Sequence, residues 1–131
     1  MKSPKYISTL FITILFAFVG VHNSAVAETK VSAEQLKTLL SGNSTEGKNI
    51  KWKTTHKMYF DADGKISRID NLNNKETGNW FINESGDLCI KVRKKRCNQV
   101  MKRDDGGYNV YRRGDLKFTF DKIVNGNPYN L

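Results

Sequence analysis

The spacing of apolar and polar residues changes along the chain. An apolar run close to the first residue is followed by a short stretch in which Leu36, Leu39 and Leu40 recur at i, i+3, i+4 spacing. That spacing places the three leucines on one face of a helix. From about residue 50 onward, apolar residues occupy every second position instead, which is typical of β-strands. The pattern therefore predicts one short helix followed by β-structure.

The ends of the predicted helix carry their own signals. Ser32 suits the N-cap position, and Gln35 stands three residues later, as in a capping box. Gly42 fits a helix end because glycine adopts the left-handed backbone conformation that terminates many helices. We expect a helix over about residues 32–41 that packs through its leucine face.

The first strand pattern runs over residues 50–60, with one apolar and one basic face. The side chains expected on its apolar face are Ile50, Trp52, Thr54, His56, Met58 and Phe60. A polar loop is expected over residues 71–78, and shorter alternating segments follow it. Because turn residues recur about every 8–12 positions, about seven or eight short strands are expected. The predicted fold is mainly β, an antiparallel meander forming a small barrel or sandwich, preceded by one short helix.

The N-terminal segment has the three parts of a secretory signal peptide. Lys2 and Lys5 precede the apolar run of residues 10–21, and small residues occupy both sides of Val26. A membrane-spanning helix needs about 20 apolar residues, which is more than this run provides. We expect a cleaved signal peptide over residues 1–27 and an exported protein, periplasmic or secreted.

The remaining residues, 28–131, suit a single β-rich domain. The chain has 131 residues, and 22 basic residues outnumber 13 acidic ones, so its formal charge is +9. A chain of this length corresponds to about one domain. The expected mature chain is therefore a basic protein, and a basic surface favours anionic partners.

Two cysteines, Cys89 and Cys97, are the only ones in the chain. In an exported protein an even number of cysteines predicts a disulfide. If the two residues lie directly opposite each other on neighbouring strands, Ile90 faces Arg96. Since a buried arginine is costly, either a bulge shifts the register or this end of the hairpin projects beyond the core.

Several short motifs follow one another in a characteristic order. They are Leu40-Ser41-Gly42-Asn43-Ser44, Tyr59-Phe60-Asp61-Ala62-Asp63-Gly64, Gly78-Asn79-Trp80, Leu88-Cys89-Ile90, Arg96-Cys97, Tyr108 with Val110, and Gly126-Asn127-Pro128-Tyr129. On these residues the chain resembles the small exported bacterial proteins grouped as domain of unknown function 995, over about residues 33–131. The resemblance implies a secreted β-rich domain with a Cys89–Cys97 disulfide. It brings no known activity and no catalytic residues.

A dense cluster of positive charge lies between the two cysteines. Its members are Lys91, Arg93, Lys94, Lys95 and Arg96. The disulfide would close this segment into a hairpin or tight loop, which suits a preformed anion-binding site. Our first hypothesis is a non-enzymatic binding module whose partner is lipopolysaccharide, anionic lipid or an anionic polysaccharide. The alternative is a solvated hairpin tip.

A second hypothesis places the function inside the fold. Trp52, His56 and Trp80 are expected to point inward, and barrels of about eight strands can hold one small ligand. This pattern predicts a small-ligand carrier with an interior pocket near these residues. A protein-binding inhibitor or effector that docks through the sheet surface is a third hypothesis.

Catalytic and metal chemistry are not indicated. His56 is the only histidine in residues 28–131, whereas a zinc site needs about three or four converging ligands. No nucleophile elbow of the G-x-S-x-G type is present. We therefore expect no enzyme, no metal and no cofactor. Nucleic acid is a disfavoured partner, because single-strand binders expose their aromatic residues and most aromatic residues here fall on inward positions.

Overall fold

The computed structural model describes Gly20 and residues 27–131. The expected signal peptide, residues 1–27, therefore lies outside the described residues except for Gly20 and Ala27. The described elements, in chain order, are β1 (Glu28–Lys30), α1 (Ala33–Leu40), β2 (Asn43–Asn49), β3 (Thr54–Phe60), β4 (Lys65–Asp70), β5 (Lys75–Ile82), β6 (Leu88–Lys91), β7 (Lys95–Arg103), β8 (Tyr108–Arg112), β9 (Asp115–Phe120) and β10 (Lys122–Asn125).

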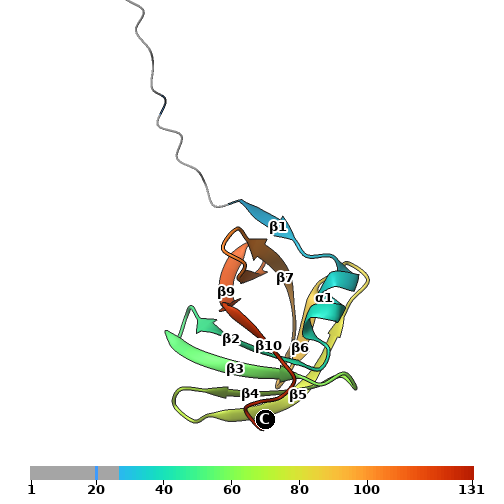
Figure 1. Cartoon of the computed structure of the whole chain (residues 1–131), viewed down its shortest axis with the longest axis vertical. Coiled ribbons are helices and arrows are strands. Elements are labelled where there is room, and N and C mark those ends of the chain that lie inside the picture. The colour runs from blue at the N-terminus through green and yellow to red at the C-terminus, as the bar shows by residue number, and fades with distance from the viewer. Residues whose placement is uncertain (1–19, 21–26) are drawn as a thin grey trace, which may run out of the picture.

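Eight of the strands form a closed antiparallel barrel (Figure 1). Strands β2 to β9 pair with one another in sequence order, and β9 closes the barrel by pairing with β2. Two short strands extend the sheet, since β1 pairs with β7 and β10 pairs with β2. The expected mainly β meander with one short helix is confirmed, and its architecture is a barrel.

Helix α1 has the predicted start. The Ser32 hydroxyl accepts a hydrogen bond from the Gln35 backbone N–H at 3.2 Å, and the Gln35 side chain accepts one from the Ser32 N–H at 3.1 Å. Leu36 and Leu40 are fully buried. In Figure 1 the helix lies on the right and the β2–β3 turn on the left. The helix therefore lies beside one end of the barrel and leaves the other end uncovered.

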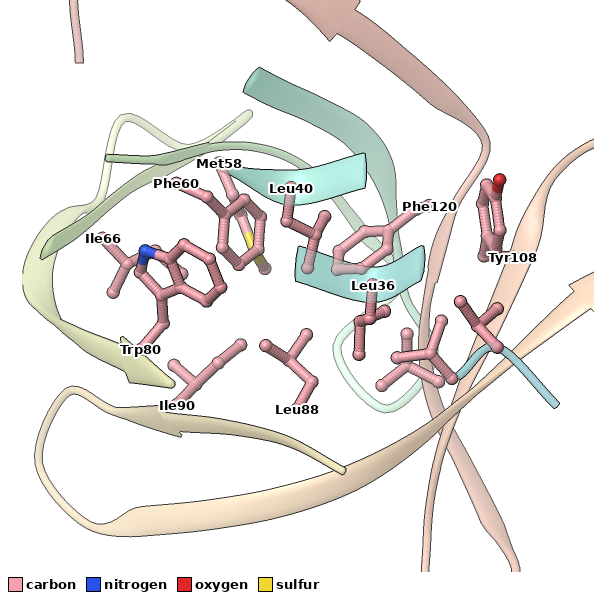
Figure 2. Close-up of a cluster of buried hydrophobic side chains, with 13 residues drawn as sticks. Leu36, Leu40, Met58, Phe60, Ile66, Trp80, Leu88, Ile90, Tyr108 and Phe120 are labelled. Carbon is pink, nitrogen blue, oxygen red and sulfur yellow. The ribbon is translucent and has the colours of Figure 1, made fainter. Parts of the chain in front are cut away.

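The apolar core lies next to the helix. Figure 2 shows Leu36 and Leu40 among the aromatic and aliphatic side chains of the barrel strands. The Phe60 ring packs edge-to-face against Trp80 and Phe120, with centroid distances of 5.4 and 5.8 Å. Burial of these large side chains supplies the main driving force for folding, at about 25 cal/mol per Å² of apolar surface.

The prediction of a strand over residues 50–60 is wrong at its start. Strand β3 begins at Thr54, and residues 50–53 form the β2–β3 turn. The Asn49 side chain accepts a hydrogen bond from the Trp52 N–H at 3.1 Å, and Lys53 adopts a φ of 53°. Because the chain reverses here, Trp52 is 67% exposed and does not point inward as expected.

Strand β2 and the start of β5 were not indicated by the hydrophobic pattern. β2 is polar throughout, yet Ser44 and Thr45 are fully buried because β3, β9 and β10 all pair with this strand. The expected loop over residues 71–78 is also too long, because β5 begins at Lys75. In both places the pairing of the backbone with neighbouring strands outweighs side-chain hydrophobicity.

The Cys89–Cys97 disulfide is confirmed. The two residues are directly opposite each other on β6 and β7, and Ile90 pairs with Arg96 without a register shift. Arg96 is exposed. Of the two arrangements expected from the sequence, a bulge or a hairpin end that projects beyond the core, the structure therefore has the second.

Removing the disulfide is expected to lower the free energy of unfolding by about 2.6 kcal/mol, because the unfolded chain regains the entropy of an open nine-residue loop. The change is Cys89→Ala with Cys97→Ala, measured by urea unfolding. Reduced wild-type protein serves as the control and should lose a similar amount. A loss below about 0.5 kcal/mol would show that the disulfide does not stabilise the barrel.

Candidate functional site

The uncovered end of the barrel is formed by four turns. In an up-and-down barrel alternate turns lie at the same end, so residues 50–53, 71–74, 92–94 and 113–114 belong together. The β2–β3 and β4–β5 turns both lie on the side away from α1 in Figure 1. We call this end of the barrel the mouth.

A cavity of about 1140 Å³ lies behind the mouth. Its walls come from strands β2 to β9, and its lower part is bounded by Met58, Ile90 and Phe118 above the apolar core. Ligand pockets of proteins commonly have volumes of about 300–1,000 Å³. The barrel therefore has room for a small organic molecule.

Positive charge dominates the cavity lining. Two acidic side chains, Asp70 and Glu76, face eight basic ones. The basic side chains are Lys51, Arg68, Lys75, Arg93, Lys94, Arg96, Arg112 and Lys117. A cleft lined mainly by one sign of charge concentrates ligands of the opposite sign.

Both acidic side chains already have partners. Glu76 accepts a hydrogen bond from Arg68 Nε at 2.7 Å and lies 3.4 Å from a terminal nitrogen of Arg93. Asp70 accepts hydrogen bonds from the side chain and backbone of Asn74, and these bonds lower the pKa of its carboxyl group. Glu76 is therefore engaged by Arg68 and Arg93, whereas Asp70 keeps its negative charge because Asn74 is neutral. Lys117 pairs with Asp115 at 3.6 Å, outside the lining residues. The lining still has six more basic than acidic side chains.

Arg96 and Arg112 carry charge that is not neutralised. Within the part of the chain that the structure describes, neither residue forms an ion pair. Partial burial lowers the pKa of Arg112, and the nearby charges of Arg96 and Arg113 lower it further, while the carboxylate of Asp115 acts in the opposite direction. An anion bound between Arg96 and Arg112 would relieve this repulsion.

His56 lies in the cavity wall as a neutral side chain. It is only 7% exposed, and burial followed by the charge of Arg68 lowers its pKa to about 4. Its ring packs edge-to-face against Phe118 at 5.8 Å. Neither ring nitrogen has a hydrogen-bond partner within the described chain, and the same holds for Oδ1 of Asn98. These polar atoms are buried within the cavity wall and carry almost no accessible surface.

The structure separates the three residues expected in an interior pocket. His56 lines the cavity, whereas the exposed Trp52 lies at its rim. Trp80 is not among the lining residues, because it packs in the apolar core and donates a hydrogen bond from Nε1 to the Asp61 carbonyl at 2.9 Å. The three side chains do not form one pocket.

The basic cluster between the cysteines is divided as well. Arg93, Lys94 and Arg96 line the cavity, whereas Lys91 and Lys95 do not. Lys91 and Lys95 are paired directly opposite each other, one position away from the Ile90–Arg96 pair, so they lie on the other face of the hairpin. The cluster therefore supplies one wall of the cavity together with two outward lysines.

Sequence reasoning missed Arg68, Asn98 and Arg112. Each lies two positions from a buried apolar residue on the same strand, so the alternation itself placed them on the inner face. A polar or basic residue at an inward position was the available signal, and it marks where the core ends and the cavity begins.

Other kinds of site find no support in the described residues. No three His, Cys, Asp or Glu side chains come together there as metal ligands. No helix within the described part of the chain is long and apolar enough to span a bilayer.

Comparisons with known proteins do not assign a family. No protein-family model matches the chain, and a search of curated proteins finds no matching sequence. The resemblance to domain of unknown function 995 therefore remains a prediction.

Proposed function

We propose that this protein is a non-enzymatic binding protein that holds a small anionic, partly apolar molecule in the mouth of its barrel. The observation that carries the proposal is the convergence of eight basic side chains on one cavity whose lining contains only two carboxylates. We further propose that the protein acts after export, since a disulfide suits an oxidising compartment.

The charge distribution favours an anionic group on the ligand. Arg68, Arg96 and Arg112 come from three different strands, β4, β7 and β8, and face the same space. A carboxylate, sulfonate or phosphate there would accept charge-assisted hydrogen bonds, which are the stronger class of hydrogen bond. The unneutralised pair Arg96 and Arg112 is the expected position of this group.

The deeper lining favours an apolar or aromatic body. Met58, Ile90 and Phe118 offer apolar surface, and the neutral His56 ring beside them adds no charge to this part of the lining. A purely polar anion would leave this surface without a partner. The best fit is an amphiphilic molecule with its charged group toward the mouth.

Two of the sequence hypotheses combine in this proposal. The basic segment between the cysteines contributes Arg93, Lys94 and Arg96, and the interior pocket contributes His56. The anionic partner is then a small molecule held inside the barrel, with the basic segment as one wall.

The proposal is tested with two fluorescent probes that share one aromatic frame. Anilinonaphthalene sulfonate carries a sulfonate, and N-phenylnaphthylamine lacks it. We expect the wild-type protein to bind the sulfonate probe with one-to-one stoichiometry and at least about tenfold more tightly than the neutral probe, a difference of about 1.4 kcal/mol. Equal affinities would contradict an anion-selective cavity.

Matched variants locate the binding site. Arg96→Gln with Arg112→Gln removes two charges that face the cavity, and should weaken sulfonate binding about tenfold. Lys91→Gln with Lys95→Gln removes two charges from the outer face of the hairpin, and should change the affinity less than about twofold. Equal weakening by both pairs would show that the probe binds through net charge and not in the cavity.

A further inference from the structure

The two ends of the barrel carry opposite charge. The four mouth turns contain five basic residues and no acidic one, namely Lys51, Lys53, Arg93, Lys94 and Arg113. The connections at the other end, residues 61–64, 83–87, 104–107 and 121, contain seven acidic residues and no lysine or arginine. Three of these carboxylates, Asp63, Asp105 and Asp121, form ion pairs with the flanking Lys65 and Arg103. The turns of the barrel therefore differ in charge between its two ends, being cationic at the mouth and acidic at the far end.

Exposed apolar side chains gather at the same mouth. Among the described residues four large apolar side chains are exposed, and three of them lie in or beside mouth turns: Ile50 at 42%, Trp52 at 67% and Leu72 at 66%. The fourth, Phe81, pairs with Cys89 on the outer wall of the barrel. Three exposed apolar side chains at one rim, at the same end as the five basic residues of the mouth turns, indicate an interaction surface.

We propose that the mouth docks onto a bilayer that contains anionic lipid. Trp52, Ile50 and Leu72 would enter the interface between headgroups and acyl chains, a region in which tryptophan is enriched. The basic residues of the mouth turns would contact the anionic headgroups. A water-soluble polyanion would match the charge but leave the three apolar side chains in water, so a lipid surface fits the mouth better.

The acidic far end fixes the orientation of docking. A negatively charged surface attracts the mouth and repels the acidic residues at the other end that have no ion pair within the described chain, namely Asp61, Glu84, Asp87 and Asp104, so the barrel approaches with its axis upright. In this orientation the cavity opens toward the lipid. The docking surface shares Lys51, Trp52, Leu72, Arg93 and Lys94 with the rim of the cavity. Its test uses vesicles alone and needs no cavity ligand.

The test uses vesicles of phosphatidylcholine alone and of phosphatidylcholine with about one third phosphatidylglycerol. We expect the protein to cosediment with the second kind only, and to dissociate as salt is raised. Trp80 is already buried, so a blue shift of tryptophan emission on binding reports Trp52. Equal binding to both kinds of vesicle, or binding without the blue shift, would overturn the proposal.

Charge variants test the orientation. Lys51→Gln with Lys53→Gln should weaken vesicle binding about thirtyfold, since each lysine near a charged membrane contributes about fivefold. Lys65→Gln with Lys102→Gln removes the same charge next to the far end, beside the turns at 61–64 and 104–107, and should have little effect. Equal effects of the two pairs would overturn docking through the mouth.

Apolar variants distinguish a bilayer from a polyanion. Ile50→Ser with Leu72→Ser should weaken vesicle binding at least about tenfold, while Phe81→Ser on the outer wall should not. Circular dichroism checks that each variant is folded. If Ile50→Ser with Leu72→Ser leaves vesicle binding unchanged, the mouth recognises charge alone and the proposal fails. The proposal also fails if heparin displaces this double variant and Phe81→Ser from vesicles equally well.

Discussion

Replacing Gly47 by alanine is expected to lower the free energy of unfolding by about 3 kcal/mol or more, at the upper end of the usual cost of overpacking. A Cβ atom at this position would lie 1.7 Å from the backbone oxygen of Thr119 and 3.2 Å from Cε1 of His56. A backbone oxygen cannot rotate away as a flexible side chain can, so strands β2 and β9 must separate.

This site is sensitive because β2 and β9 close the barrel. Their paired register contains a single residue pair, Asn49 with Phe118. Three further hydrogen bonds support the closure, donated by the backbone N–H groups of Lys48 at 3.1 Å, Ile50 at 3.0 Å and Asp121 at 2.7 Å. Pushing the strands apart at Gly47 would weaken these bonds together.

Gly114→Ala provides the matched control. Gly114 lies in a mouth turn with a φ of +80°, and nothing lies within 4 Å of the position of an added Cβ. Its substitution should cost only the left-handed backbone penalty, about 1 kcal/mol. Urea unfolding of both variants measures the difference. Equal costs would show that the close approach at Gly47 does not limit the stability of the barrel.

The stability of the protein is expected to fall by about 3 kcal/mol as the pH is lowered from about 7 to 4, because of His56 alone. Burial keeps the pKa of this side chain at about 4 in the folded protein, whereas an unperturbed histidine in the unfolded chain has a pKa of 6.5. Between these two values the unfolded chain binds a proton and the folded chain does not, so acid favours unfolding. The full contribution is present above about pH 6.5.

His56→Gln isolates this contribution, since glutamine is polar and does not titrate. The free energy of unfolding of wild type and variant should converge, or change order, as the pH falls toward 4. Asp70 and Asp105 also have lowered pKa values, so they lose their stabilising charge under more acidic conditions, but they do so in both proteins. Parallel pH profiles for the two proteins would show that His56 is not held neutral by the fold.

The sequence predicted those parts of the fold that depend on local patterns. Ser32, Gln35 and Leu36 are sufficient to identify the helix, because capping and helical spacing involve neighbouring residues. The alternation from His56 to Phe60 likewise identified β3. The disulfide followed from two cysteines in a chain for which the sequence predicts export.

The remaining parts depend on contacts between distant segments. β2 is a polar segment that becomes a strand only because three other strands pair with it, and Trp52 is exposed because the chain turns at residues 50–53. The cavity unites Arg68, Arg96 and Arg112 through the closure of the barrel, and the sequence places them far apart. Closure sets the order of the strands around the barrel, which the alternation pattern does not contain.

The most direct measurement is heteronuclear NMR of the labelled protein during titration with anilinonaphthalene sulfonate. If the ligand enters the barrel mouth, the largest shift changes will appear at the side-chain amide of Asn98, the Nε–H of Arg96 and the ring of His56, all of which line the cavity. Shift changes confined to outward residues such as Lys91 and Lys95, with Asn98 and His56 unaffected, would contradict the proposed binding site.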